Sequence, residues 1–259
     1  MAITYDDIAP AILVEADGPV RIVTLNKPDQ LNAMSDDLHE AIRLVWDALD
    51  DDADARSVVL TGAGRAFSSG GYMPNFVRNY EDPVARERDI HHAELIARAM
   101  IDCRLPIVAA VNGPAVGLGC SLATMCDIVL ISERAFMCDP HVNVGLTAAD
   151  GGVVTWPLHM GLLQAKEYLL LGERIPAEQC VQLGLATKVV KPEELQDLAL
   201  DYARRLAAQP VQALQTTKRA LNLHMRASAD RVLPYALASE LTSFATDDVR
   251  RIAEEFTSK

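Results

Sequence analysis

Aromatic residues are scarce in this sequence, at 5% of 259 residues, although half of the residues are hydrophobic. The apolar content is therefore mostly aliphatic, which is typical of Ala/Val/Leu-rich α/β enzymes and argues against disorder. A chain of this length is near the upper limit for one hydrophobic core. We therefore expect a single large domain, with room for a helical appendage.

Long apolar runs, a leader segment and paired cysteines are also missing. No stretch of about 18 apolar residues is free of charge, so we expect no membrane span. The N-terminal "MAITYDDIAP" has neither the basic nor the apolar region of a signal peptide. No CxxC pair occurs, which favours reduced, buried thiols in a cytoplasmic protein. The cysteines are Cys103, Cys120, Cys126, Cys138 and Cys180.

Basic residues are outnumbered, with 24 Lys and Arg against 36 Asp and Glu, for a formal net charge of −12. Such a surface repels phosphate backbones, so we expect no nucleic-acid partner. A small anionic ligand is not excluded, because a helix N-terminus or a local basic patch can bind one.

The first part of the chain alternates between strand and helix patterns. Residues 11–28 form two β-type runs around Asp17-Gly18-Pro19, which indicates a hairpin. A helical apolar stripe follows within residues 31–52, then a short buried strand at 57–62 and a helix over 84–102. Residues 105–132 read as strand, small-residue helix and strand, with a break at Asn112-Gly113-Pro114. This alternation predicts an α/β fold with parallel strands.

From Gly151 onward the pattern is almost wholly helical. Residues 191–210 carry one helix between Pro192 and Pro210, and the segments 211–225 and 230–245 predict two more. Apolar stripes on such helices pack on a neighbour, either in the same chain or in the next subunit.

Two glycine-rich turns follow predicted strands. "AFSSGGYM" can expose backbone N–H groups near Ser69 and Gly70, and "GPAVGLGCSLATM" places Leu118 at a helix N-terminus. If the turns meet, one N–H from each could hold a single oxygen, as an oxyanion hole does for enolates and tetrahedral anions. The alternative is that the glycines serve only close packing.

The segment 137–152, "MCDPHVNVGLTAADGG", holds two titratable groups in an apolar setting. His141 titrates near neutrality and can transfer protons, although it could equally be a hydrogen-bonded pocket residue with no such role. Asp150 precedes Gly151-Gly152, so it could also merely cap a helix. The remaining histidines lie on predicted helices without acidic or cysteine partners, so we expect packing or surface roles and no metal site. They are His39, His91, His92, His159 and His224.

Five segments in order resemble the crotonase superfamily, the enoyl-CoA hydratases and isomerases: "NKPDQLNAMS", "GRAFSSGGYM", "LPIVAAVNGPAVGLGCSLATMCDIVLIS", "VGLTAADGG" and "FATDD". The resemblance runs from about residue 11 to 256. It implies an α/β fold with a crotonase-like ββα spiral core over residues 1–195 and a C-terminal helical oligomerisation region over 196–259. It also implies a homotrimer or homohexamer.

The resemblance assigns residues to an acyl-CoA site. It implies that the N–H groups of Ser69 and Leu118 hold the thioester carbonyl, and that Lys27 meets a CoA phosphate at the entrance. Coenzyme A enters as part of the substrate, and no other cofactor is implied. The remaining expected substrate and CoA contacts are Asn32, Ala33, Ser68, Gly70, Tyr72 and Gly117.

The chain departs from the family at the residues that decide the chemistry. Typical hydratases carry two glutamates where this sequence has Ser121 and His141, so hydration by the usual glutamate pair is not implied. Tyr72 stands where many members have an acidic residue, and it either covers or narrows the acyl pocket. In superfamily hydrolases of β-diketones, a histidine and an aspartate of this spacing act with a C-terminal glutamate. Glu240 is the candidate, although it could instead be solvated or face another subunit.

Three functions follow from this resemblance. The first is a lyase or isomerase that acts on an acyl-CoA thioester through an enolate, with His141 and Asp150 moving protons. The second is a CoA-independent carbon–carbon hydrolase of a cyclic β-diketone, which uses His141, Asp150 and Glu240. The third is a catalytically silent binding protein, for which the acidic charge disfavours RNA.

Overall fold

The main sheet of the protein has six strands in the order β1-β2-β3-β4-β6-β9, in a computed structural model that describes residues 3–257. Strands β1 (Ile12–Asp17) and β2 (Val20–Leu25) form the expected antiparallel hairpin. The other neighbours pair in parallel, as the alternating pattern predicted: β3 (Ser57–Gly62), β4 (Ile107–Val111), β6 (Ile128–Ser132) and β9 (Lys188–Val190).

A second, three-stranded sheet has the order β5-β7-β8. Strand β5 (Ala115–Val116) leads into the short helix α4 (Leu118–Thr124), and β7 (Phe136–Cys138) leads into the 3₁₀ turn η3 (His141–Val144). Strand β8 (Ile175–Pro176) closes the sheet. Because β5 and β7 are paired in register, the residues that follow them emerge side by side.

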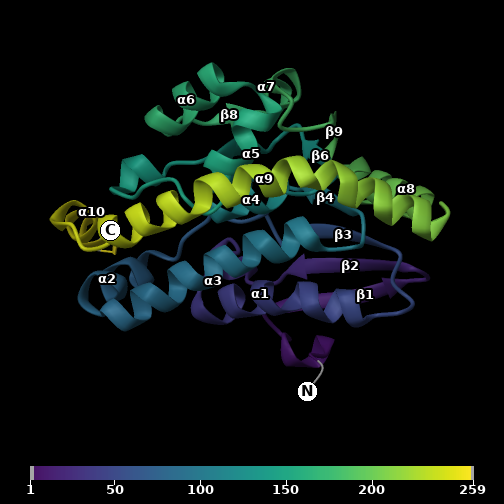
Figure 1. Cartoon of the computed structure of the whole chain (residues 1–259), viewed down its shortest axis with the longest axis horizontal. Helices are drawn as coiled ribbons and strands as arrows, with labels where there is room; N and C mark the ends of the chain where they lie inside the picture. Colours follow the sequence, from purple (N-terminus) through teal and green to yellow (C-terminus); the bar gives the residue numbers. More distant parts are fainter. Residues whose placement is uncertain (1–2, 258–259) are drawn as a thin grey trace.

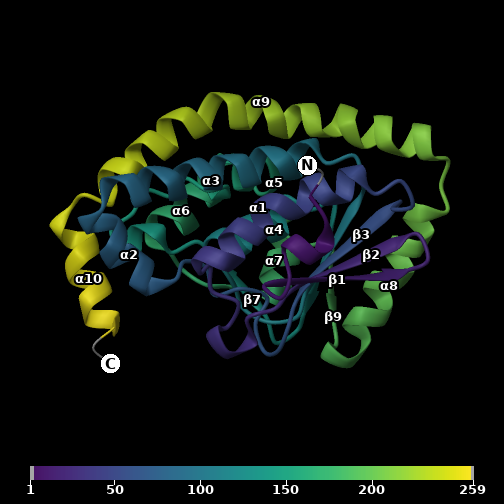
Figure 2. The ribbon, with the colours of Figure 1, turned by 90° about the horizontal axis from the view of Figure 1, so that it is seen from below.

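Helices cover both faces of the main sheet (Figure 2). On one face, α1 (Asp36–Asp51) buries the predicted stripe, which is Leu38, Ile42, Val45, Trp46 and Leu49. On the other face, α8 (Leu195–Ala207) packs its small residues against alternate strand positions such as Val59 and Val108. Side chains alternate between the faces of a strand, so the strands supply both clusters.

Helix α9 (Val211–Ser243) runs along α3 (Pro83–Asp102), and α10 (Asp247–Thr257) packs against α2 (Met73–Glu81) (Figures 1 and 2). The expectation of two helices over 211–245 was wrong, because α9 is continuous. The connecting residues 226–229 contain neither glycine nor proline, and Ala229 and Leu233 are buried in the main core. Burial of these side chains against the core thus stabilises the helix across a segment whose hydrophobic periodicity is weak.

The remaining helices are α5 (Gly152–His159), α6 (Leu162–Leu171) and α7 (Ala177–Leu183), with 3₁₀ turns at Tyr5–Asp7, Pro28–Gln30 and Pro192–Glu194. One apolar cluster extends from Ile8 to Leu237, so the C-terminal helices share the core of the sheet. Among residues 3–257, none of the helices combines the length and the hydropathy that crossing a membrane requires.

Candidate active site

The two glycine-rich turns meet, which is the condition that the interpretation as an oxyanion hole requires. The N–H of Val116 donates to the carbonyl of Ser68 at 2.9 Å, and Ser68 and Ala115 form a parallel bridge. Gly70 has a φ of +82°, and a Cβ there would lie 2.6 Å from the Val116 carbonyl oxygen. Only glycine combines that backbone conformation with so close an approach.

The predicted oxyanion donor Ser69 is wrong, because its N–H donates to the carbonyl of Leu31 at 2.9 Å. The free amide of this turn is that of Gly71: both Gly71 and Leu118 line one pocket, and their N–H groups donate to no backbone carbonyl within the described chain. Leu118 is the first residue of α4, where an amide has no partner inside the helix. The sequence located the turn but not the free amide. The backbone changes direction at Gly70, whose φ is +82°, so the amide before it faces Leu31 and the amide after it lines the pocket.

Several residues expected to contact substrate have structural partners instead. The Asn32 side chain is fully buried and donates to the carbonyls of Ala63, Ala66 and Phe67. The Ser68 hydroxyl is equally buried and donates to the Asn32 carbonyl at 2.7 Å. These two side chains are therefore occupied in holding the first turn in place.

The other expected contacts lie at or near the pocket. Tyr72 lines it, whereas Ala33 is buried and precedes Met34, which lines the pocket. Gly117 is the N-cap of α4 and donates its N–H to the Cys138 carbonyl at 2.9 Å, so the first helix amide without a backbone partner is that of Leu118. Lys27 forms an ion pair with Asp37 outside the pocket lining.

His141, Asp150 and Glu240 come together from three separate elements. His141 Nδ1 pairs with Asp139 Oδ1, while its Nε2 lies 3.3 Å from Asp150 Oδ2 and 3.9 Å from Glu240 Oε1. All four side chains are buried. Glu240 reaches the site from the last turn of α9, so it is neither solvated nor directed away from the pocket.

Asp150 does not act as a helix cap. The N-cap of α5 is Gly151, and Asp150 Oδ1 accepts a hydrogen bond from the Ser121 hydroxyl at 2.7 Å. Ser121 thus holds one oxygen of the Asp150 carboxylate in place. The aspartate therefore faces a hydroxyl on one oxygen and an imidazole on the other.

The glycine pair after Asp150 makes room for these side chains. A Cβ at Gly151 would lie 2.6 Å from Ser121 Cβ, and a Cβ at Gly152 would lie 2.0 Å from Asp139 Oδ2. Any larger residue at either position would displace the groups that contact His141 or Asp150.

The charges at the site push the pKa values of its groups apart. Burial disfavours imidazolium, but the negative charges of Asp139 and Asp150 outweigh it and raise the pKa of His141 well above its ordinary value. Burial also opposes the ionised form of Asp150, yet His141 and the Ser121 hydroxyl hold its pKa below the usual range. Burial, reinforced by the neighbouring aspartates, raises the pKa of Glu240 to about 8. At neutral pH the site therefore combines an ionised Asp150 with a protonated Glu240.

Sequence reasoning missed Asp139. It lies two residues before His141 in "CDPH", and its side chain is 1% exposed. A buried aspartate beside a histidine fixes the imidazole in one tautomer and orientation. The only signal in the sequence was the proximity of the two residues, which also occurs in many solvated loops.

The pocket between these groups has a volume of about 100 Å³. Apolar walls come from Met34, Tyr72, Phe76, Ile90, Leu146 and Phe244. Phe76 of α2 and Phe244, which follows α9, meet edge to face with their ring centroids 5.4 Å apart. Helix α2 therefore covers the pocket as a lid.

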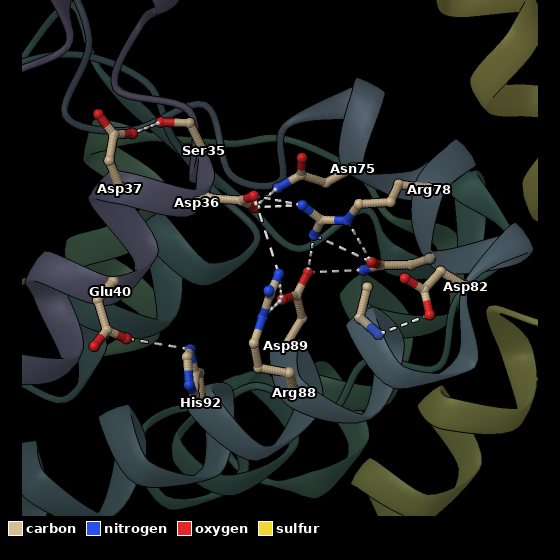
Figure 3. A network of polar contacts seen from close by, with 12 residues as sticks. Ser35, Asp36, Asp37, Glu40, Asn75, Arg78, Asp82, Arg88, Asp89 and His92 are labelled. Atoms are coloured by element: carbon tan, nitrogen blue, oxygen red, sulfur yellow. Dashed lines mark hydrogen bonds and ion pairs between the residues drawn. The ribbon is translucent and has the colours of Figure 1, made fainter.

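An arginine holds this lid (Figure 3). Arg78 of α2 donates to Asp36 of α1 at 2.5 and 2.7 Å and to Asp89 of α3 at 2.5 Å. Asn79 donates to the same Asp89 oxygen at 3.0 Å. No helix was predicted over residues 73–81, because the pairing of Arg78 depends on helices α1 and α3 and not on the local pattern of α2.

His39 was also missed as a pocket residue, since the sequence indicated a packing or surface role. It lies on α1 and lines the pocket together with His141 and Asp150. Burial lowers the pKa of His39 to about 4, so the ring is neutral at neutral pH.

Asp139, His141 and Asp150 offer potential ligand atoms within 4.8 Å of one another. Each ring nitrogen of His141, however, already faces a carboxylate, Nδ1 toward Asp139 and Nε2 toward Asp150. A metal ion would have to displace a hydrogen-bonded proton from one of them. The arrangement therefore fits a hydrogen-bonded triad better than a metal centre.

Comparisons with known proteins agree with the fold and with the resemblance. The family model for enoyl-CoA hydratase/isomerase matches residues 15–258. A crystal structure of an enoyl-CoA hydratase/isomerase from Mycobacterium paratuberculosis is 49% identical, with a TM-score of 0.93, over 96% of this chain and 99% of that one.

Curated relatives cover almost the whole chain. The short-chain-enoyl-CoA hydratase of Clostridium acetobutylicum is 29% identical over 96% of this chain and 95% of the relative. The crotonyl-CoA hydratase of Syntrophomonas wolfei is 30% identical over the same shares. Together with the converging turns, these matches confirm the predicted crotonase superfamily and its fold: the chain belongs to the enoyl-CoA hydratase/isomerase family of enzymes.

Proposed function

We propose that this enzyme acts on a short acyl-CoA thioester, whose carbonyl oxygen is held by the N–H groups of Gly71 and Leu118. The observation that carries the proposal is the position of these two free amides in the same small pocket as His141, Asp150 and Glu240. The positive end of α4 adds to the stabilisation of an enolate at this point.

The proton transfers divide between the two carboxyl groups. Asp150 is ionised and serves as base, while His141 orients the water that is to be activated. Glu240 is protonated and delivers its proton to the α-carbon of the enolate. Addition of water to an enoyl thioester then places hydroxide on the β-carbon, and the proton of the water passes to Asp150.

The same groups can restore the starting state. Asp150 lies 3.3 Å from His141 Nε2, and that nitrogen lies 3.9 Å from Glu240 Oε1. Small movements of the His141 ring can thus carry the proton from Asp150 back to Glu240. Without water at the β-carbon, the same exchange would move a double bond, so hydration and isomerisation share this machinery.

Removal of one amide tests the oxyanion hole. Leu118→Pro deletes the N–H at the first position of a helix, where proline is tolerated. We expect turnover of crotonyl-CoA to fall by about 10²–10³. Leu118→Ala keeps the amide and serves as the matched control. Equal activity of the two variants, both folded by circular dichroism, would refute the role of this amide.

A carbon–carbon hydrolase of a cyclic β-diketone is the second candidate, favoured by the proximity of Glu240 to His141. Water activated by His141 and Asp150 would attack one carbonyl. The ring carbon–carbon bond would break, and Glu240 would protonate the resulting enolate. Titration with CoA and with acetyl-CoA separates the two candidates. Absence of binding at millimolar concentration, together with consumption of a small diketone, would favour the hydrolase.

We propose that Lys27 contacts a CoA phosphate after release from Asp37, and that CoA is the only cofactor, carried by the substrate. The five cysteines are free and buried, which agrees with the expectation of a cytoplasmic protein. Lys27→Gln is expected to weaken binding of CoA more than binding of a short N-acetylcysteamine thioester that lacks the phosphates.

We also propose that copies of the chain associate, as a trimer or a hexamer. Helix α6 carries four leucines that are 55 to 84% exposed, and several exposed apolar side chains on one helix are typical of an interface between chains. They are Leu162, Leu163, Leu170 and Leu171. Sedimentation of Leu163→Glu should show a smaller assembly than the wild type, whereas an unchanged assembly would place the interface elsewhere.

A further inference from the structure

The pocket has a second polar side, away from the proton-transfer groups. Its residues are His39 of α1, Asn75 and Asn79 of α2 and Asp89 of α3. A plain hydrocarbon acyl chain would leave such a wall without partners, at a cost for every group that lacks a hydrogen bond. Which of these groups is already satisfied by the protein therefore decides what the wall can bind.

Three of the four residues already have hydrogen-bond partners within the protein. Asn75 donates to Asp36 at 2.8 Å, and Asn79 donates to Asp89 at 3.0 Å while accepting from Arg78. Asp89 also accepts from Arg78 and Arg88, as Figure 3 shows. The lid network thus uses the polar atoms of these residues and leaves them little capacity for a ligand.

His39 is the exception. Within residues 3–257, neither nitrogen of its ring has a hydrogen-bond or ion-pair partner, and its one aromatic contact is the ring of His92 at 5.8 Å between centroids. The ring also borders a second hollow on the outer side of α1 and α3, lined by Asp36, Glu40 and His92 among others. Water in that hollow can satisfy one edge of the ring, which leaves the other edge for a molecule in the pocket.

The protonation state of His39 restricts the ligand. A neutral imidazole offers one donor and one acceptor and no charge. Because burial keeps the ring neutral, a carboxylate beside His39 would gain no ion pair from it and would face the carboxyl groups of Asp89 and Asp150, while the imidazole of His141 is already paired with Asp139 and Asp150. A hydroxyl or keto oxygen suits the site.

We propose that His39 is a specificity-determining residue, which hydrogen-bonds a hydroxyl or keto oxygen on the acyl group and so selects short oxygenated acyl thioesters over plain hydrocarbon ones. The inference rests on the proposed function, because it requires that an acyl thioester occupies the pocket. The pocket of about 100 Å³ limits the acyl group to a few carbons beyond the thioester.

Binding of matched, unreactive thioesters tests the proposal. Pentanoyl-CoA and 4-oxopentanoyl-CoA differ only in one CH₂ replaced by C=O, and calorimetry gives both dissociation constants. We expect the wild type to prefer the oxo compound by about tenfold or more, because a lost hydrogen bond leaves a buried group unpaired. His39→Phe, which keeps the ring shape without nitrogen, should bring the ratio close to one.

Two further variants keep the test sharp. His39→Gln retains a donor and an acceptor and should preserve part of the preference. His91→Phe alters an exposed histidine on α3 and should preserve all of it. Equal affinities of the wild type for the two thioesters would overturn the inference, and so would a preference that survives in a folded His39→Phe. In either case, binding of pentanoyl-CoA would still support the proposed function. Failure of both thioesters to bind would overturn the two together.

Discussion

The imidazole Nε2 of His141 lies 3.3 Å from Asp150 Oδ2, and both side chains are buried. The contact joins η3 to the loop that leads into α5, and Asp139 holds the opposite edge of the ring. A histidine between two carboxyl groups is a strongly polarised unit in a low-dielectric site, so its protonation should respond measurably to either neighbour.

Asp139→Asn should lower the pKa of His141, because Asp139 raises this pKa more than Asp150 does and the substitution removes its charge. The Cε1 proton resonance of His141, followed by NMR against pH, measures this change directly. Asp29→Asn, at an exposed position, is the matched control and should leave the titration unchanged. An unaltered pKa in Asp139→Asn would show that Asp139 does not govern the ring.

Glu240→Gln should change the pH dependence of turnover. The proposed acid must be protonated, so the wild-type rate should decline as the pH rises through about 8. The glutamine variant should lose about 10²- to 10⁴-fold in rate, the range typical of general acid catalysis, and should lose this basic limb. A basic limb that persists in Glu240→Gln would assign it to another group.

The same substitution should change stability in a pH-dependent way. The pKa of Glu240 is raised from 4.5 to about 8 in the folded protein, so its stabilising proton is present below 4.5 and is lost as the pH rises through 8. The wild type should therefore lose stability relative to Glu240→Gln between these values, by up to about 1.4 kcal/mol per pH unit. Urea unfolding of both proteins at pH 5 and pH 8 measures the difference, and a constant difference would contradict the raised pKa.

Gly152→Ala should destabilise the protein through Asp139. The added Cβ would lie 2.0 Å from Asp139 Oδ2, so the carboxyl group must move away from the ring. Overpacking of this kind typically costs about 1–3 kcal/mol. The cost should shrink in an Asp139→Ala background, and a double-mutant cycle by chemical denaturation measures the coupling. Additive effects would mean that the methyl group is accommodated elsewhere.

Arg78→Met should loosen the lid, since Arg78 ties α2 to both α1 and α3. Amide hydrogen exchange over residues 73–81 should accelerate, and KM should rise more than kcat falls, because the chemical groups lie on other elements. Arg56→Met, at an exposed position outside the pocket, is the control. Unchanged exchange in α2 would show that the contact of Phe76 with Phe244 suffices to hold the lid.

The sequence by itself determined the α/β class, the hairpin, the buried stripe of α1 and the positions of two glycine turns. These features depend on local periodicity and on backbone conformations that few residues adopt, so they are visible in neighbouring letters. The resemblance also indicated His141, Asp150 and Glu240 as a set. The structure brings these three side chains within hydrogen-bonding or near-contact range.

Only the tertiary structure decided which amide is free at the first turn, because Ser69 is paired with Leu31, which is far away in the sequence. It also decided that Asp139 and His39 belong to the site, and that α9 continues through its weak middle. Each of these facts depends on a partner from another element. Long-range packing sets such partners, and the local pattern of a chain carries no record of them.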